Sequence, residues 1–260
     1  MTARRRLTMN LNQGLLMHFF ENGAIPLYVM IPALIGVVAV AYLLGSINSA
    51  IIVSKLLFGE DVRTKGSGNA GTTNVLRNYG KKAALFTLIG DMLKTALSIF
   101  IAGLVFGFWY IRAVSVSEYC YIAGLFSVIG HVFPVYYKFR GGKGVLSTAT
   151  MVIFLSPAVA AVLILAFVGI VAFTKFVSLG SVTGCILYPV ILNGYFMVFM
   201  GGQSPTPLMV LSSIILAILI VWCHRANLSR ISRGEESKLS FKTKPPVNSR
   251  SVSNESEDEE

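Results

Sequence analysis

The sequence predicts an all-α membrane protein that crosses the bilayer with seven short helices. Of its 260 residues, 54% are hydrophobic and 13% are charged, whereas a soluble domain carries about 25% charged residues. Apolar stretches follow one another along most of the chain. Crossing a hydrocarbon core about 30 Å thick takes about 20 such residues. This composition excludes a disordered protein and argues against a soluble globular one.

Seven apolar stretches give the helix count. They cover about 27–58, 82–110, 116–137, 144–156, 158–173, 177–200 and 206–224. The first is too long for one straight crossing, so we expect its end, through Lys55, to lie at the membrane interface. Only Ser156 and Pro157 separate the fourth stretch from the fifth, which leaves two short helices or one long kinked helix as alternatives.

The distribution of basic residues decides between these alternatives. With seven spans, most of the 22 Lys and Arg residues fall on one side of the membrane, in the loops 59–81 and 138–143, at Lys175 and in the tail. The positive-inside rule makes that side cytoplasmic, so the N-terminus lies outside and the C-terminus in the cytoplasm. A single helix over 144–173 would place the basic tail outside, so seven spans fit better.

The ends of the chain differ from its membrane domain. We expect an N-terminal extension over 1–26, a transmembrane domain over 27–233 and a cytoplasmic tail over 234–260. The tail is rich in Ser, Lys and Pro and ends in acidic residues, a composition that predicts disorder. The Arg cluster near the N-terminus is followed by no small-residue cleavage site, so it does not indicate a cleaved signal peptide.

The net charge of +10 does not indicate nucleic acid binding. The basic residues lie in short loops between apolar segments, where they set topology and meet anionic headgroups or anionic substrates. The three cysteines lie inside apolar stretches and form no CxxC pair, so a packing role is predicted. No HExxH or clustered-Cys pattern indicates a metal, and no cofactor is predicted.

The first polar motif is Gly66-Ser67-Gly68-Asn69-Ala70-Gly71-Thr72-Thr73-Asn74, followed by Arg77. Three glycines let backbone N–H groups turn inward as an anion nest, and Ser, Thr and Asn add neutral donors. The glycines match GxGxxG, but no strand precedes them, so we reject a dinucleotide site. A Walker A loop also fails because Thr72 stands where Lys is needed. The alternative is a flexible turn between helices.

The second motif comprises the segments 130–134 (GHVFP) and 138–145 (KFRGGKGV). Cations beside Gly141, Gly142 and Gly144 can hold a phosphate at close backbone approach, with Lys143 as a point charge. No Ser or Thr follows Lys143, so this is not a nucleotide P-loop. The alternative is a basic loop that only fixes topology.

Two smaller motifs lie at the start of the sixth apolar stretch and at the end of the seventh. Ser178 and Ser181 lie near a helix start, where a serine is often only a cap. His224 and Asn227 share a helix face at i, i+3 beside Arg225, so both can point into one polar pocket. The alternative for His224 is a side chain that reaches to the interface.

Asp91 and Lys94 are charged residues inside the second span. Each costs about 2.5–3.5 kcal/mol to insert alone, and at i, i+3 they can partly neutralise each other. This pair indicates either a functional site or a structural clamp. The first span contains the polar residues Ser46, Asn48 and Ser49. They too indicate either a functional site or a contact between helices.

Under the predicted topology all these polar motifs face one side of the membrane. The sequence contains no paired-carboxylate cluster, no His-x4-Asp dyad and no GxSxG elbow. An enzyme with this sequence would therefore work without an evident protein base.

Together the motifs resemble the acyl-phosphate-dependent glycerol-3-phosphate acyltransferases of bacteria, the PlsY type. The resemblance runs from about Gly45 to Glu235. It rests on Gly45-Ser46, Asp61-Val62-Arg63, GSGNAGTTN, Arg77-Asn78-Tyr79-Gly80, Asp91 with Lys94, GHVFP, FRGGKGV, SLGS and HRANLSR with Gly234-Glu235. Any one piece is weak, but their shared order and membrane face are specific.

The resemblance implies transfer of a fatty acyl group from acyl phosphate to the 1-hydroxyl of glycerol 3-phosphate. The products would be lysophosphatidate and inorganic phosphate, in the first step of phospholipid synthesis. It also implies a multi-pass protein of the bacterial plasma membrane with its active site facing the cytoplasm. An upstream enzyme that makes acyl phosphate would be a partner, beside the lipid bilayer.

The resemblance also assigns residues. The implied catalytic set is Ser67, Arg77, Lys143, His224 and Asn227. The implied substrate-binding set is Gly66, Gly68, Asn69, Gly71, Thr73, Asn74, Gly141, Gly142, Gly144, Ser178, Ser181 and Arg225. The chain departs from the family pattern at Asn48, Thr95 and 146–148, where the family usually has Pro, Gly and Ala-Thr. These changes loosen inferences about pocket shape.

The implied chemistry agrees with the residues. Both substrates carry phosphate, which accounts for two glycine-plus-cation loops. Acyl phosphate is already activated, so positioning and oxyanion stabilisation would supply most of the rate. We expect a substrate phosphate to take the hydroxyl proton, and the acyl chain to enter from the bilayer.

The rival class is a transporter or channel for organic phosphates. Against it, the sequence shows no inverted repeat, and the polar motifs gather at one face. A structural scaffold would account for none of the glycine–cation loops.

Overall fold

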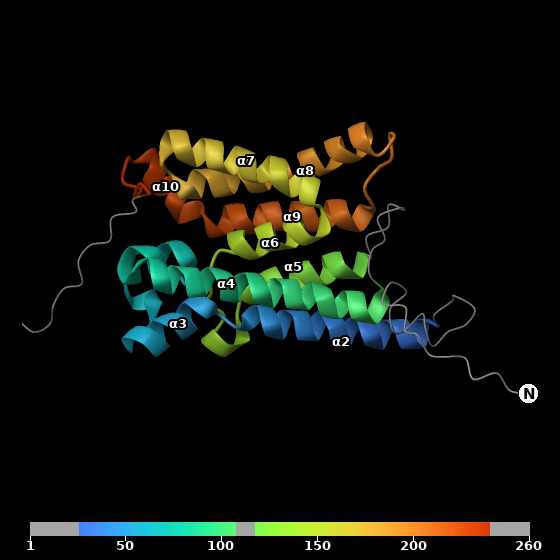
Figure 1. Ribbon diagram of the computed structural model, residues 1–260, viewed down its shortest axis with the longest axis horizontal. Coiled ribbons are helices and arrows are strands. Elements are labelled where there is room, and N and C mark those ends of the chain that lie inside the picture. The colour runs from blue at the N-terminus through green and yellow to red at the C-terminus, as the bar shows by residue number, and fades with distance from the viewer. Residues whose placement is uncertain (1–25, 108–117, 240–260) are drawn as a thin grey trace, which may run out of the picture.

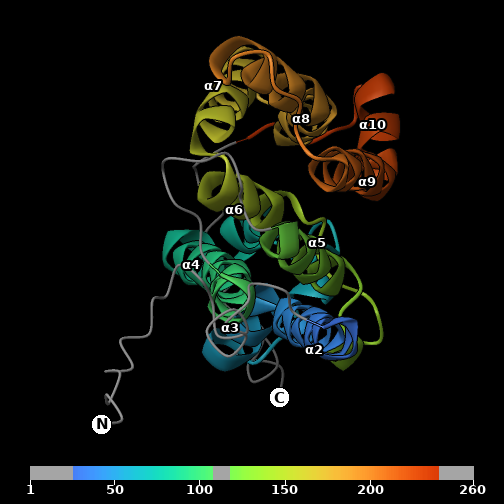
Figure 2. The ribbon, with the colours of Figure 1, turned by 90° about the vertical axis from the view of Figure 1, so that its right-hand side faces the viewer.

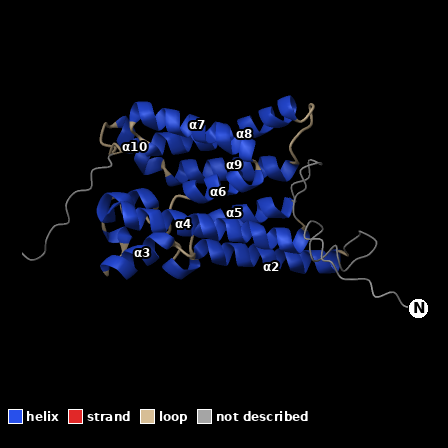
Figure 3. Cartoon of the chain, viewed as in Figure 1, coloured by secondary structure: helices blue, strands red, loops and turns tan. Residues whose placement is uncertain are grey.

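The computed structural model describes residues 26–107 and 118–239, and within these ranges the chain is helical with connecting turns and contains no strand (Figures 1 and 3). The all-α prediction is therefore confirmed. The expected N-terminal extension up to residue 25, the junction 108–117 and the tail from residue 240 lie outside the described residues.

The long first apolar stretch forms two helices. Helix α2 covers Leu27–Ser46 and α3 covers Ser49–Phe58. At the break the Asn48 side chain accepts a hydrogen bond from the Ile51 N–H at 3.1 Å, which satisfies one unpaired donor at the start of α3 and contributes about 1 kcal/mol. The 3₁₀ turn η1, Val62–Thr64, follows.

Helix α4 covers Thr72–Phe106 and is broken at Gly80, whose φ of 86° lies in the left-handed region. Glycine adopts this conformation without steric cost, so the chain turns here. The short part before Gly80 belongs to the first polar motif. The part after it corresponds to the second predicted span.

The fourth and fifth apolar stretches form two helices. After α5, Glu118–Val132, and the 3₁₀ turn η2, Val135–Tyr137, α6 covers Val145–Leu155 and α7 covers Pro157–Thr174. Ser156 between them has a non-helical φ of −149° and ψ of 69°. The 11 residues of α6 span about 16 Å at 1.5 Å each, only about half the hydrocarbon thickness.

The last helices are α8, Val177–Phe199, α9, Pro207–Cys223, and α10, Arg225–Ser232. In the described residues, five helical stretches are long and apolar enough to cross a membrane, and α9 with α10, bent by 54°, adds a sixth. The prediction of a polytopic membrane protein is confirmed. The count of seven crossings and the orientation of the termini remain predictions.

The helices form two groups, with α2 to α6 on one side and α7 to α10 on the other (Figure 2). Large buried side chains such as Tyr121, Met151, Tyr188 and Leu216 fill the core. Helices α3 and α10 and the first part of α4 lie at the same end of the bundle (Figure 1). This end holds both glycine motifs.

Candidate active site

The first glycine loop is organised by Asn74. Asn74 is 3% exposed, and the carbonyls of Val62, Lys65 and Asn69, each 3.0–3.1 Å from its Nδ2, share the two N–H donors of this amide. Its Oδ1 accepts from the Ser67 N–H at 3.1 Å. One buried amide thus fixes the loop and leaves Ser67 exposed at its rim.

The glycines of this loop permit its backbone conformation. Gly66 and Gly68 have φ values of 58° and 69°, in the left-handed region that favours glycine. Gly71 precedes the first residue of α4, and Thr73 lies partly buried in its first turn. Arg77, one turn further along, donates to the Ser237 carbonyl at 3.0 Å.

The second glycine loop packs against α5 and the first loop. The Gly141 and Gly142 N–H groups donate to the carbonyls of Val132 and His131 at 3.2 and 3.1 Å. A Cβ at Gly142 would collide with Nε2 of His131 and lie 2.7 Å from the Ala70 carbonyl oxygen. Only a glycine lets the two loops meet here. Gly144 has a φ of 80° and precedes α6.

Lys143 extends from the second loop towards α10. Its ammonium donates a hydrogen bond to Oδ1 of Asn227. The pKa of Lys143 is lowered to about 8, chiefly by burial; the Glu236 carboxylate opposes the shift, and the cations Arg230 and Arg77 contribute to it. An anion bound next to this lysine would favour its protonated form and so raise its pKa.

Glu236 joins the residues around Asn227. Its Oε1 accepts from Ser178 at 2.8 Å and from Asn227 at 2.6 Å, and its Oε2 accepts from Arg230 at 2.8 Å. Burial acts to raise the pKa of this carboxyl, but the three hydrogen bonds outweigh it and hold the pKa below its usual value.

The segment after α10 is therefore part of the site. The sequence assigns residues from 234 onwards to a disordered tail, whereas residues 234–239 lie against the bundle. Besides the Glu236 contacts, Leu239 donates to the Lys175 carbonyl at 2.7 Å. The sequence interpretation missed Glu236 because an acidic residue shortly before an acidic tail gave no separate signal.

His224 lies at the bend between α9 and α10 and is 3% exposed. Its Nδ1 lies 2.8 Å from the Ile220 carbonyl, and because a carbonyl only accepts, Nδ1 carries the proton. The neutral ring then has Nε2 free as an acceptor. His224 and Asn227 lie on the same side as Lys143, as the i, i+3 spacing predicts.

The remaining predicted residues differ in whether they contact the polar cluster around Glu236. Ser178 reaches Glu236, whereas the Ser181 hydroxyl donates to the Val177 carbonyl of its own helix at 2.8 Å. Arg225 is exposed and places its guanidinium 4.4 Å from the centre of the Trp222 ring. Ser178 therefore joins the polar cluster, whereas in the described part of the chain Ser181 and Arg225 donate to the nearby carbonyls of Val177 and Trp222.

A second polar cluster lies deeper, between α2, α4 and α5. Lys94 Nζ lies 2.9 Å from Oδ1 of Asp91 and 2.9 Å from Nδ1 of His131, and it donates to the Ile47 carbonyl at 2.7 Å. The sequence found the Asp91–Lys94 pair but not the participation of His131, which comes from α5.

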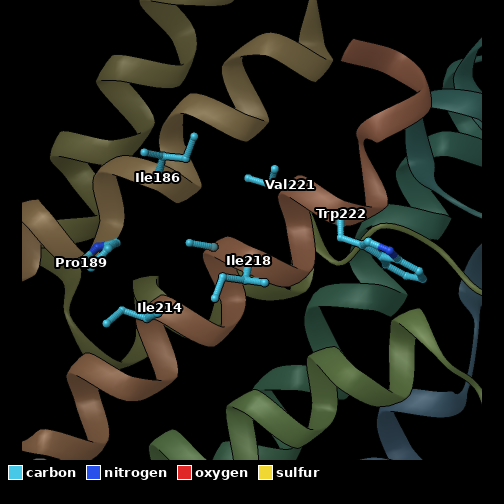
Figure 4. Close-up of a pocket in the computed structure, with 7 residues that line it drawn as sticks. Ile186, Pro189, Ile214, Ile218, Val221 and Trp222 are labelled. Carbon is cyan, nitrogen blue, oxygen red and sulfur yellow. The ribbon is translucent and has the colours of Figure 1, made fainter. Parts of the chain in front are cut away.

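An apolar groove of about 480 Å³ lies between α8 and α9 (Figure 4). Ile186 and Pro189 line it from α8, and Ile214, Ile218, Val221 and Trp222 line it from α9. Trp222 precedes His224 by two residues, so the groove begins near the polar cluster and continues along exposed apolar residues of α8 and α9.

Comparison with known proteins identifies the family. Residues 35–234 match the family model described as glycerol-3-phosphate acyltransferase. A glycerol-3-phosphate acyltransferase of Syntrophomonas wolfei is 38% identical over 77% of this chain and 94% of that protein. One from Thermoanaerobacter sp. is 39% identical over 78% of this chain and 94% of its own length. This chain belongs to the glycerol-3-phosphate acyltransferase family.

Solved structures confirm the PlsY type. The glycerol 3-phosphate form of PlsY, an integral membrane glycerol 3-phosphate acyltransferase, is 35% identical with a TM-score of 0.68, over 80% of this chain and 96% of that one. Its lysophosphatidic acid form is 34% identical with a TM-score of 0.66. The protein is an acyltransferase of this membrane family.

The described residues of this acyltransferase contain no group of three His, Cys, Asp or Glu side chains that could hold a metal ion. What they offer is hydrogen-bond donors and cations at one end of the bundle, and an apolar groove beside them. Such a site can bind an anionic head and an apolar chain together.

Proposed function

We propose that this acyltransferase moves a fatty acyl group from acyl phosphate to the 1-hydroxyl of sn-glycerol 3-phosphate, releasing lysophosphatidate and inorganic phosphate. The observation that carries the proposal is the meeting of two glycine loops at Ala70 and Gly142. Each loop brings its own cation, Arg77 or Lys143. Two phosphate-bearing molecules can therefore be held within reach of each other.

Lys143 and the start of α6 suit the phosphate that reacts. A helix N-terminus attracts anions, because its first N–H groups have no partner within the helix. The hydroxyls of Ser147 and Thr148 in the first turn of α6 are buried and make no hydrogen bond among the described residues. These donors lie in the segment where the chain departs from the family pattern, next to the glycine loop.

His224 and Asn227 suit the glycerol part of the acceptor. In our proposal the free Nε2 of His224 accepts a hydrogen bond from a hydroxyl and so orients it. Ser67 and Arg77 approach from the first loop, with the remaining loop residues as backbone donors. Ser178 joins the proposed substrate-binding set through Glu236, whereas the Ser181 hydroxyl bonds within its own helix and the Arg225 guanidinium lies over Trp222.

The proposed reaction needs no protein nucleophile. The 1-hydroxyl oxygen attacks the acyl carbonyl carbon, the bond from that carbon to the phosphate oxygen breaks, and a substrate phosphate takes the hydroxyl proton. Loop N–H groups and the Lys143 charge would stabilise the oxyanion that develops. Correct placement of hydroxyl and carbonyl would supply much of the remaining rate.

The apolar groove between α8 and α9 suits the acyl chain. It is lined by apolar side chains, several of which are exposed on the outer face of the bundle. A chain that enters from the bilayer would place its head near His224, at the cytoplasmic side in our topology. We further propose the bacterial plasma membrane as the location and an upstream enzyme as the source of acyl phosphate.

The direct test uses purified protein in detergent with glycerol 3-phosphate and either acyl phosphate or an acyl thioester. We expect lysophosphatidate and an equal amount of inorganic phosphate with acyl phosphate only. Turnover with the thioester alone would contradict the proposed donor. Release without any membrane gradient also separates an acyltransferase from a transporter, which leaves its substrate unchanged.

The pH–rate profile of His224→Ala tests the proposed proton acceptor. If a substrate phosphate takes the proton, the acidic limb of the profile persists in the variant at a lower overall rate. Loss of that limb in His224→Ala would make the histidine the base.

A further inference from the structure

We propose that Asp91, Lys94 and His131 are positioning residues that hold the two glycine loops in register. None of the three lines the polar cluster around Lys143. They are 1%, 6% and 4% exposed, respectively, within the helices of the bundle. The proposal rests on the proposed function of the loops as holders of two phosphates.

Lys94 is the centre of the cluster because its ammonium meets three other groups. It lies 2.9 Å from Asp91 Oδ1, donates to the Ile47 carbonyl at 2.7 Å, and lies 2.9 Å from Nδ1 of His131. The contact with Asp91 is an ion pair, because Oδ1 of Asp91 makes no hydrogen bond among the described residues. The buried ammonium is enclosed by these three groups, so it is not placed to bind a substrate directly.

The Lys94 contact fixes the state of the His131 ring. Nδ1 accepts from the ammonium, so the proton of the neutral ring sits on Nε2. That Nε2 faces the second glycine loop, since a Cβ built on Gly142 would collide with it. The cluster thus presents an N–H group to the underside of the loop that ends in Lys143.

The first loop rests on the same cluster by another route. Lys94 holds the Ile47 carbonyl at the break between α2 and α3. The next residue, Asn48, donates from Nδ2 to the Ala70 carbonyl at 3.3 Å. The Ala70 carbonyl also meets Gly142. A shift of Lys94 would therefore move both loops at their point of contact.

Charge balance explains why the cluster can be buried among apolar helices. Aspartate and ammonium cancel, and the ring is neutral. Removal of one charged partner leaves the other buried and uncompensated, which is costly, whereas removal of both is much better tolerated. A charge-neutral double variant can therefore separate folding from positioning.

The first experiment uses a double variant that carries both Asp91→Asn and Lys94→Gln. It is compared with the wild-type protein and with the control variant Thr87→Val. Thr87 is fully buried on α4, one turn from Asp91, and its hydroxyl bonds only within the helix, to the Ala83 carbonyl. We expect the double variant to melt near the wild type but to lose tenfold or more in kcat/KM for both phosphorylated substrates. Thr87→Val should keep wild-type kinetics. Wild-type kinetics in a folded double variant would overturn the proposal.

A pair of substitutions at His131 decides the matter if the double variant does not fold. The Gln amide nitrogen falls near the position of Nε2, and the Asn amide falls near Nδ1. We expect His131→Asn to have the higher melting temperature, because it keeps a partner for Lys94. We expect His131→Gln to have the higher kcat/KM and the tighter binding of glycerol 3-phosphate by calorimetry, because it keeps the donor below the loop.

Activity that simply follows melting temperature across the two His131 variants would make the cluster a structural clamp and overturn the proposal. This outcome differs from failure of the proposed function, in which the wild-type protein itself releases no lysophosphatidate.

Discussion

The two polar clusters of this protein differ in how far they are shielded from the surface. In the deep cluster Lys94 meets Asp91, His131 and the Ile47 carbonyl, and its side chains are almost fully buried. In the outer cluster Lys143, Asn227 and Glu236 are joined across a loop, a short helix and the segment after it. There, 35% of the Arg230 side chain remains exposed.

This difference suggests two roles: the deep cluster supports the glycine loops, and the outer cluster binds the phosphates. A fully buried cluster can change partners only by opening, so it keeps one geometry and suits the support of a loop. A cluster that reaches the surface can exchange a hydrogen bond for one to a phosphate oxygen at less cost, because solvent can pair with the group that is released. The predictions below test this division, in order of expected effect.

The largest effect is expected for Lys143→Ala. Its ammonium is the loop cation of the outer cluster, and loss of a charge-assisted contact to the reacting phosphate is worth about 3 kcal/mol, or roughly a 100-fold fall in kcat. Steady-state phosphate release measures it, with circular dichroism to confirm folding. Full activity in this variant would remove the second loop from the mechanism and with it the contrast between the clusters.

A smaller loss is expected for Gly142→Ala, which acts where the two clusters meet. The new Cβ would push the His131 ring from the Ala70 carbonyl, and such overpacking costs about 1–3 kcal/mol. We expect kcat/KM to fall tenfold or more while the melting temperature falls by a few degrees. Gly184→Ala is the matched control, because a Cβ there has nothing within 4 Å.

The sequence predicted the fold class and named several members of the outer cluster, and the physical reason is local. Apolar stretches of membrane length identify spans, and a glycine beside a cation is visible within one loop. The break at Ser156 was also predicted, because counting the basic residues on each side of the membrane favoured two segments over one. The close approach of two loops at Gly142 is also visible in the sequence, because it requires a glycine and this loop is rich in glycine.

The deep cluster was only half predicted because its partners come from different helices. Asp91 and Lys94 share one helix and stand out as charges in an apolar run. His131 joins them from α5, and the Ile47 carbonyl is a backbone group at a helix break. Neither contact follows from spacing along the chain. Glu236 was missed for a similar reason, since only the fold brings it to Ser178 and Asn227.

The pH dependence tests the openness of the outer cluster. With a pKa of about 8 in the free protein, Lys143 loses its charge as pH rises through that value, so kcat/KM should fall by roughly fivefold between pH 8 and 9 at the limit of full dependence. In Lys143→Arg the guanidinium stays charged, so whatever activity remains should show no alkaline limb below pH 10.

Glu236→Gln sharpens this assignment. The Glu236 carboxylate favours the charged form of Lys143, so its removal lowers the pKa of Lys143 and moves the alkaline limb to lower pH. Stopped phosphate-release assays across pH measure the shift. A limb that stays in place would mean that another group titrates, and the outer cluster would then be less coupled than its hydrogen bonds indicate.

The smallest effect is expected from the serines of α8, and it separates neighbours that the sequence treats alike. Ser178→Ala removes a hydrogen bond to Glu236 worth about 1 kcal/mol, or roughly a fivefold rise in KM for glycerol 3-phosphate. Ser181→Ala removes only a bond to the Val177 carbonyl within its own helix, so its kinetic constants should change less than twofold. Equal losses would extend the binding site one turn deeper into α8, since Ser181 would then have to meet substrate directly. In that case burial alone would not distinguish the positioning side chains from those that bind.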